Sequence, residues 1–118
     1  MEQTHHTIAY VELGADDLAA SRSFYESAFG WTFNDYGPDY AGIRALDGDD
    51  EVGGLTAAAT ASRGGPLVLL YSEDLDASVR AVEGAGGTVT SPPFEYPGGR
   101  RFHFSDPAGN ELGVYQPS

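Results

Sequence analysis

Short segments of alternating apolar and polar residues open each half of the chain and predict β-strands there. These segments are TIAYVEL at 7–13 and LVLLY at 67–71. Apolar residues at helical spacing follow each segment, behind an acidic residue that can cap a helix: Asp16 or Asp17 in the first half and Asp74 in the second. Each half therefore begins with a strand and a helix.

Glycines end both predicted helices, and further short strands follow. Gly30 and the pair Gly86–Gly87 tolerate the left-handed conformation common at helix ends. Turns rich in Gly, Pro and Asp, such as YGPDY at 36–40 and SDPAGN at 105–110, separate the strands. The predicted strands are about 31–35, 41–46, 52–58, 88–91, 100–105 and 111–115. The order is βαβββ, twice, which is an α+β class.

The two halves also match in sequence without a gap. Asp17-Leu18 corresponds to Asp74-Leu75, an offset of 57 residues, and Gly30 corresponds to Gly87 at the same offset. Two copies are too few for a solenoid and indicate paired modules instead. We expect one domain over 1–118, with module one at about 5–61, a linker SRGGP at 62–66 and module two at about 67–116.

Composition narrows the classes of partner. Eighteen acidic and six basic residues give a net charge of −12, which disfavours nucleic acid and is compatible with a cationic small molecule. No apolar run reaches the roughly 18 residues that a membrane span needs, and the N-terminal sequence lacks the features of a signal peptide. The chain has no cysteine, so disulfides and thiolate metal sites are excluded and a cytoplasmic location is expected.

Three segments resemble the vicinal oxygen chelate superfamily, which includes glyoxalase I, extradiol dioxygenases and bleomycin-resistance proteins. They are VELGADDLAASRSFYESAFGW in module one, and EDLDASVRAVEGAGG and FHFSDPAGNELGVY in module two. The resemblance covers nearly the whole chain. It implies a mixed sheet from both modules that curls around a cleft, with the helices on the outer faces.

The resemblance also implies where metal ligands would stand. Metal enzymes of this superfamily place His, Gln or Glu at four strand positions, which here are Tyr10, Leu67, Gly113 and either Thr56 or Gly54. Divalent metals bind imidazole and carboxylate groups, and these residues provide neither. We therefore expect no metal and no other cofactor.

Strand alternation predicts which side chains face the cleft. Apolar walls with a few convergent polar groups are typical of small-ligand sites. The predicted ligand-binding residues are Tyr10, Glu12, Tyr71, Arg101, His103, Glu111 and Tyr115. Glu12 and His103 are the candidates for acid–base catalysis. The alternatives are structural: Glu12 could pair with Arg101 or His103, and Glu111 could simply be solvated. The tyrosines of YGPDY are expected near the cleft mouth.

Three functions are compatible with this pattern. The first is a metal-independent protein that binds a small planar or cationic organic molecule. The second is an enzyme, of lyase, isomerase or dioxygenase-like type, that uses Glu12 and His103 or a relocated metal on these residues and Glu111. The third is an accessory domain with a protein partner. The resemblance also implies a homodimer, because small proteins of this fold commonly pair.

Overall fold

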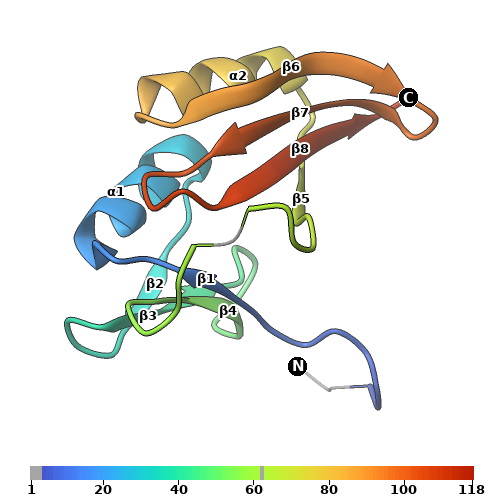
Figure 1. The fold of residues 1–118 in the computed structure, drawn as a ribbon. Helices are drawn as coiled ribbons and strands as arrows, with labels where there is room; N and C mark the ends of the chain where they lie inside the picture. The colour runs from blue at the N-terminus through green and yellow to red at the C-terminus, as the bar shows by residue number, and fades with distance from the viewer. Residues whose placement is uncertain (1–3, 62) are drawn as a thin grey trace.

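The computed structural model describes residues 4–61 and 63–118, which form two βαβββ modules (Figure 1). Residues 1–3 and Ser62, the first residue of the predicted linker, lie outside this description. Module one consists of β1 (Val11–Gly14), α1 (Leu18–Phe29), β2 (Phe33–Asp35), β3 (Tyr40–Arg44) and β4 (Glu51–Thr56). Module two consists of β5 (Leu69–Tyr71), α2 (Leu75–Gly84), β6 (Thr88–Tyr96), β7 (Gly99–Ser105) and β8 (Glu111–Pro117). The predicted α+β class with two tandem modules is confirmed.

Each module builds its own four-stranded mixed sheet. The strand orders are β1-β4-β3-β2 and β5-β8-β7-β6, with β1 parallel to β4 and β5 parallel to β8. The remaining neighbours are antiparallel. Because a helix connects the first strand of each module to the rest, that strand can join its sheet in parallel. The two modules thus repeat one topology, which agrees with the duplication seen in the sequence.

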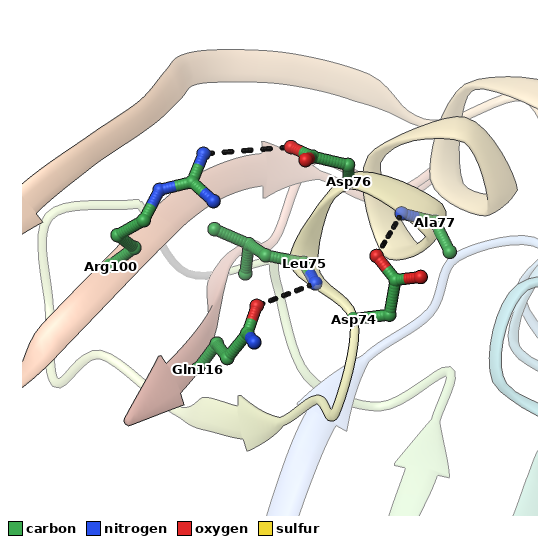
Figure 2. Close-up of polar contacts among 6 residues, drawn as sticks. All are labelled: Asp74, Leu75, Asp76, Ala77, Arg100 and Gln116. Atoms are coloured by element: carbon green, nitrogen blue, oxygen red, sulfur yellow. Dashed lines mark hydrogen bonds and ion pairs between the residues drawn. The ribbon is translucent and has the colours of Figure 1, made fainter. Parts of the chain in front are cut away.

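Acidic caps begin both helices. Asp17 is the N-cap of α1 and accepts from the Ala20 amide at 3.1 Å. Asp74 is the N-cap of α2 and accepts from the Ala77 amide, also at 3.1 Å (Figure 2). Gly30 ends α1 with φ 70°, in the left-handed region that favours glycine. Gly86, with φ 95°, follows the C-cap of α2. The sequence therefore predicted the start of both helices and the left-handed glycine at the end of each.

Each helix covers one face of its own sheet, and the two modules share one apolar core. The burial of Phe102 and Phe104 on β7, between partly exposed residues, shows which face the core covers. Phe104 also contacts module one, because its ring lies 5.9 Å from that of Phe24 on α1. We call the face of each sheet that lies away from its helix the open face.

Strand β6 is the clearest difference from the sequence prediction. It was expected to end near 91, before Pro92 and Pro93, but it runs to Tyr96. Its pairing with β7 is irregular between Ser91 and Phe94, across the two prolines. Proline lacks the amide that the ladder needs, so β6 tolerates it as an edge strand with a local break in register.

Neither helix in the described part of the chain is long and apolar enough to cross a bilayer.

Candidate functional site

The predicted ligand-binding residues lie on the open faces of both sheets, in two groups. Tyr10 and Glu12 belong to module one. The members of the second group, all in module two, are Tyr71, Arg101, His103, Glu111 and Tyr115. Among residues 4–61 and 63–118, no hydrogen bond, ion pair or ring contact joins one group to the other. Within one chain, the structure does not bring Glu12 to Arg101 or His103.

Glu12 has a different partner from the ones that the sequence suggested. It is exposed, and its Oε2 accepts a 2.9 Å hydrogen bond from the hydroxyl of Tyr40 on β3. The Tyr40 hydroxyl also lies 2.7 Å from that of Tyr10. Two tyrosines and a carboxylate thus form a chain of hydrogen bonds between residues 10–12 and strand β3.

Glu51, at the start of β4, extends this chain. Its carboxylate accepts from Tyr10 at 3.2 Å, from Asn34 at 3.1 Å and from Tyr36 at 2.5 Å. We call the whole set the tyrosine–carboxylate network. Its members are Tyr10, Glu12, Asn34, Tyr36, Tyr40 and Glu51.

The network places two carboxylates beside three tyrosine rings on one open face. Burial, followed by its hydrogen bonds to Tyr10 and Glu12, raises the pKa of Tyr40. Burial also raises the pKa of Tyr10. Hydrogen bonds from Tyr36 and then Asn34 lower the pKa of Glu51. At neutral pH the phenols therefore stay protonated and Glu51 stays ionised, so this face carries negative charge between aromatic rings.

Two glycines leave room for the network. A Cβ atom at Gly54 would lie 2.1 Å from the Tyr40 hydroxyl, and one at Gly42 would lie 2.1 Å from a carboxylate oxygen of Glu51. Gly42 and Gly54 are themselves cross-strand partners in β3 and β4. Any side chain at these positions would displace the network.

Sequence reasoning identified only part of this network. Alternation along the first strand identified Tyr10 and Glu12, and the YGPDY loop pointed to its tyrosines. Sequence reasoning missed Asn34 and Glu51. The position of Glu51 depends on how β3 and β4 align, and that register includes a shift between Ile43 and Arg44.

The open face of module two carries Arg101, His103 and Glu111 among aromatic rings. The guanidinium carbon of Arg101 lies 4.7 Å from the ring centre of Tyr96 and 5.4 Å from that of Phe94. His103 follows two residues later on the same face of β7, and its ring makes an edge contact with Phe94 at 5.6 Å. A cation over aromatic faces is a favourable arrangement, and it leaves this face able to receive negative or planar groups.

Two further contacts complete this face. Nδ1 of His103 lies 3.9 Å from Oε2 of Glu111, which also accepts from Thr90 at 3.2 Å. The rings of Tyr71 and Tyr115 meet edge-on at 6.0 Å. Glu111 is therefore held by neighbours as well as solvated.

The register between strands shows which glycine of module one corresponds to Gly113. Gly113 pairs with Leu69 in module two, and Gly54 pairs with Glu12 in module one. Glu12 and Leu69 differ by the repeat offset of 57 residues (69 − 12), so the equivalent of Gly113 is Gly54 and not Thr56.

The residues present do not fit the metal that the fold family implies. Beyond Gly54 lies the Tyr40 hydroxyl, and a Cβ at Gly113 would lie 2.6 Å from Leu69. The two first-strand positions hold Tyr10 and Leu67. Among the described residues, no three His, Asp or Glu side chains gather in a way that could hold a metal ion. In particular, Glu12 lies in one module and the pair His103 and Glu111 in the other.

A cavity of about 230 Å³ lies elsewhere, between the two modules. It is lined by residues of both modules, including Leu13, Trp31 and Leu70, and by none of the predicted ligand-binding residues. Trp31 stacks on Tyr25, with ring centres 4.4 Å apart. This apolar space belongs to the junction of the modules and not to the open faces.

Comparison with known proteins gives consistent matches. Residues 7–114 match the family model described as Glyoxalase/Bleomycin resistance protein/Dioxygenase superfamily. An anthracycline biosynthesis protein, DnrV of Streptomyces peucetius, is 33% identical over 92% of this chain, but the match covers 46% of that protein. The chain thus spans about half the length of this relative.

Solved structures show the same fold. A glyoxalase/bleomycin resistance protein/dioxygenase family enzyme from Burkholderia phytofirmans aligns with a TM-score of 0.77 at 19% identity, over 94% of this chain and 98% of that one. TnmS3 of Streptomyces sp. CB03234, described as an antibiotic binding protein, aligns with a TM-score of 0.71 at 22% identity, over 99% and 100%. With the duplication, the fold and the family match in agreement, the chain belongs to the glyoxalase/bleomycin resistance protein/dioxygenase superfamily.

Proposed function

We propose that this chain binds a small organic molecule, planar or cationic, on its open faces and without the family's metal. The observation that carries the proposal is the tyrosine–carboxylate network, in which Glu12 and Glu51 stand beside the rings of Tyr10, Tyr36 and Tyr40. Carboxylates attract a cation, and aromatic rings stabilise both cations and planar groups. The net charge of −12 adds long-range attraction for a cation.

A second copy of the chain supplies the opposite wall in this proposal. The open face of module one carries Glu12 and Glu51, whereas that of module two carries Arg101 and His103 together with Glu111. A ligand held between module one of one copy and module two of the other would therefore meet carboxylates on one side and a guanidinium on the other. The ligand would then lie between them in a homodimer, and the absence of cysteine agrees with a cytoplasmic location.

The relatives support a planar, amine-bearing ligand as the first probe. One relative is named for anthracycline biosynthesis and one structural neighbour for antibiotic binding. An anthracycline with an amino sugar carries both a planar ring system and a cationic group, and its fluorescence reports binding.

The test is a fluorescence titration of that anthracycline with the wild type and three variants. Glu12→Gln and Glu51→Gln each remove one negative charge of the network. Glu26→Gln removes the same charge from an exposed position on α1 and serves as the control. We expect roughly threefold to tenfold weaker binding for the two network variants and no change for Glu26→Gln. Equal losses in all three, or no binding by the wild type, would count against the proposal.

An enzyme is the second candidate. The 3.9 Å approach of His103 to Glu111 favours it, because a carboxylate beside an imidazole can orient it for proton transfer. A lactoylglutathione lyase from Agrobacterium tumefaciens shares the fold, with a TM-score of 0.69 at 21% identity over 97% of this chain and 96% of that one. A lyase or isomerase reaction would use His103 with Glu12 from the other copy.

Product analysis separates the two candidates. A binding protein returns the bound molecule unchanged after long incubation, and His103→Gln alters only its affinity. An enzyme converts it, and both His103→Gln and Glu12→Gln abolish conversion while the melting temperature stays the same.

A further inference from the structure

Arg101 has no acidic partner in a chain rich in acids. Eighteen residues are Asp or Glu, and three of the five other arginines pair with them: Arg22 with Asp35, Arg44 with Asp49 and Arg100 with Asp76. Among the described residues, no carboxylate lies within ion-pair distance of Arg101. Its guanidinium instead lies over Tyr96 and Phe94.

The duplication explains why that partner is missing. Gly54 corresponds to Gly113, and the antiparallel register then makes Tyr40 (opposite Thr56) the equivalent of Arg101 (opposite Tyr115). In module one, Tyr40 bonds to Tyr10 and Glu12. The equivalents of these two in module two are Leu67 and Leu69, which have no side-chain acceptor. Module two thus has a hydrogen-bond donor, Arg101, at the position of Tyr40 but no side-chain acceptor at the positions of Tyr10 and Glu12.

Two buried nitrogen atoms on this face have no hydrogen-bond partner in the described part of the chain. They are Nε of Arg101, which is a donor, and Nε2 of His103, which donates when the ring carries its proton there. Buried polar atoms without a partner cost free energy, and native structures contain few of them. Both side chains are themselves partly exposed on the same face of β7, so one group that reorients them could contact both.

We propose that Arg101 and His103 form a subsite for an anionic oxygen group, a carboxylate or a phenolate, carried by a planar ligand. The inference rests on the proposed binding function and adds an orientation to it. The anionic end of the ligand lies against module two, stacked beside the rings that support Arg101. Its cationic or neutral end lies against the tyrosine–carboxylate network. A planar guanidinium binds such oxygens with two parallel hydrogen bonds.

The experiment uses two naphthalene probes that differ in charge, 2-naphthoate and 2-naphthylmethylammonium, with affinities measured by calorimetry. The variants are Arg101→Gln, Arg101→Lys and Arg100→Gln. Arg100 is the matched control, since it is adjacent in β7 but pairs with Asp76 of α2 at 3.5 Å (Figure 2). Melting temperatures identify any variant that fails to fold. If Arg101→Gln fails to fold, Arg101→Lys still tests the site, because it retains the positive charge.

We expect Arg101→Gln to weaken naphthoate binding about tenfold or more and Arg101→Lys to weaken it less. Arg100→Gln should leave it unchanged, and the ammonium probe should bind equally to all variants. Naphthoate should also shift the side-chain resonances of His103 and not those of His5 or His6. If both probes bind but Arg101→Gln does not weaken naphthoate binding more than binding of the ammonium probe, the proposal of this subsite is wrong while the proposed function stands. If neither probe nor the anthracycline binds, both proposals fail.

Discussion

The hydroxyl of Tyr25 donates a 2.8 Å hydrogen bond to Oδ2 of Asp106 and so joins α1 of module one to the β7–β8 turn of module two. The other carboxylate oxygen of Asp106 accepts three backbone amides, those of residues 108–110. The side chain of Asn110 donates to Asp106 and, at 2.7 Å, to the carbonyl of Gly14. Burial and then the charge of Asp106 raise the pKa of Tyr25 well above its ordinary value. The two modules are held together by this buried network as well as by apolar packing.

Replacing Tyr25 with phenylalanine tests that relationship. Tyr25→Phe removes one donor to a buried carboxylate, so we expect the free energy of unfolding at pH 7 to fall by about 1–3 kcal/mol. Chemical denaturation measures the change. Tyr71→Phe is the control, because Tyr71 is 62% exposed and its ring packs edge-on against that of Tyr115. Equal stability of Tyr25→Phe and the wild type would show that the hydrogen bond does not stabilise the junction.

The same turn shows how far sequence reasoning reaches. SDPAGN was predicted to be a turn between two strands, and a turn lies there. Its side chains do more than the local pattern indicates, because the partners of Asp106 and Asn110 include Tyr25 and Gly14, which lie 81 and 96 residues away in the chain. Periodicity and caps predict local elements, whereas buried polar contacts between distant segments follow from tertiary packing.

For the site, too, the local pattern predicted some side chains but not the contacts between distant segments. Alternation predicted that Tyr10, Glu12, Arg101 and His103 all face one cleft. It could not show that Tyr40 is the partner of Glu12, since that contact depends on the order β1-β4-β3 in the sheet. The division of the seven candidates between two open faces also follows from the packing of the modules and has no local signal.

The hydrogen bond from Tyr36 to Glu51 gives a pH-dependent prediction. Because this bond and that from Asn34 lower the pKa of Glu51, the group stabilises the fold above its unfolded pKa, and that contribution is lost as the pH falls through the folded pKa. In Tyr36→Phe, the pKa of Glu51 should rise towards its ordinary value. An NMR titration of the Glu51 side-chain carboxyl measures this directly.

The control for this titration is Tyr71→Phe, which removes a hydroxyl group from module two, outside the network. The pKa of Glu51 should stay lowered in this variant, as in the wild type. Both Tyr36 and Glu51 are near the surface, so high salt should reduce the difference for Glu51. An unchanged pKa of Glu51 at low salt would contradict the hydrogen bond.

Alanine at Gly54 should disturb the network directly. Its Cβ would lie 2.1 Å from the Tyr40 hydroxyl and 2.4 Å from the adjoining ring carbon, so the ring must move and lose its bonds to Glu12 and Tyr10. We expect Gly54→Ala to destabilise the protein by about 1–3 kcal/mol, as overpacking does, and to weaken anthracycline binding. Gly48→Ala is the control, because no atom lies within 4 Å of its added Cβ. Similar unfolding midpoints for the two variants would contradict this placement of Tyr40.

The open face of module two is predicted to contact a second copy of the chain. It exposes apolar side chains, including Tyr71 at 62%, Phe94 at 37% and Leu69 at 36%. If a second copy covers them, light scattering should give a mass of about 25 kDa, twice the 12.5 kDa of one chain. Leu69→Glu places a charge on this face and should shift the mass to that of a monomer. Ser27→Glu adds the same charge at an exposed position on α1 and should leave the dimer intact. A wild type that stays at 12.5 kDa across the accessible concentrations would rule out the homodimer and leave each open face to bind its ligand alone.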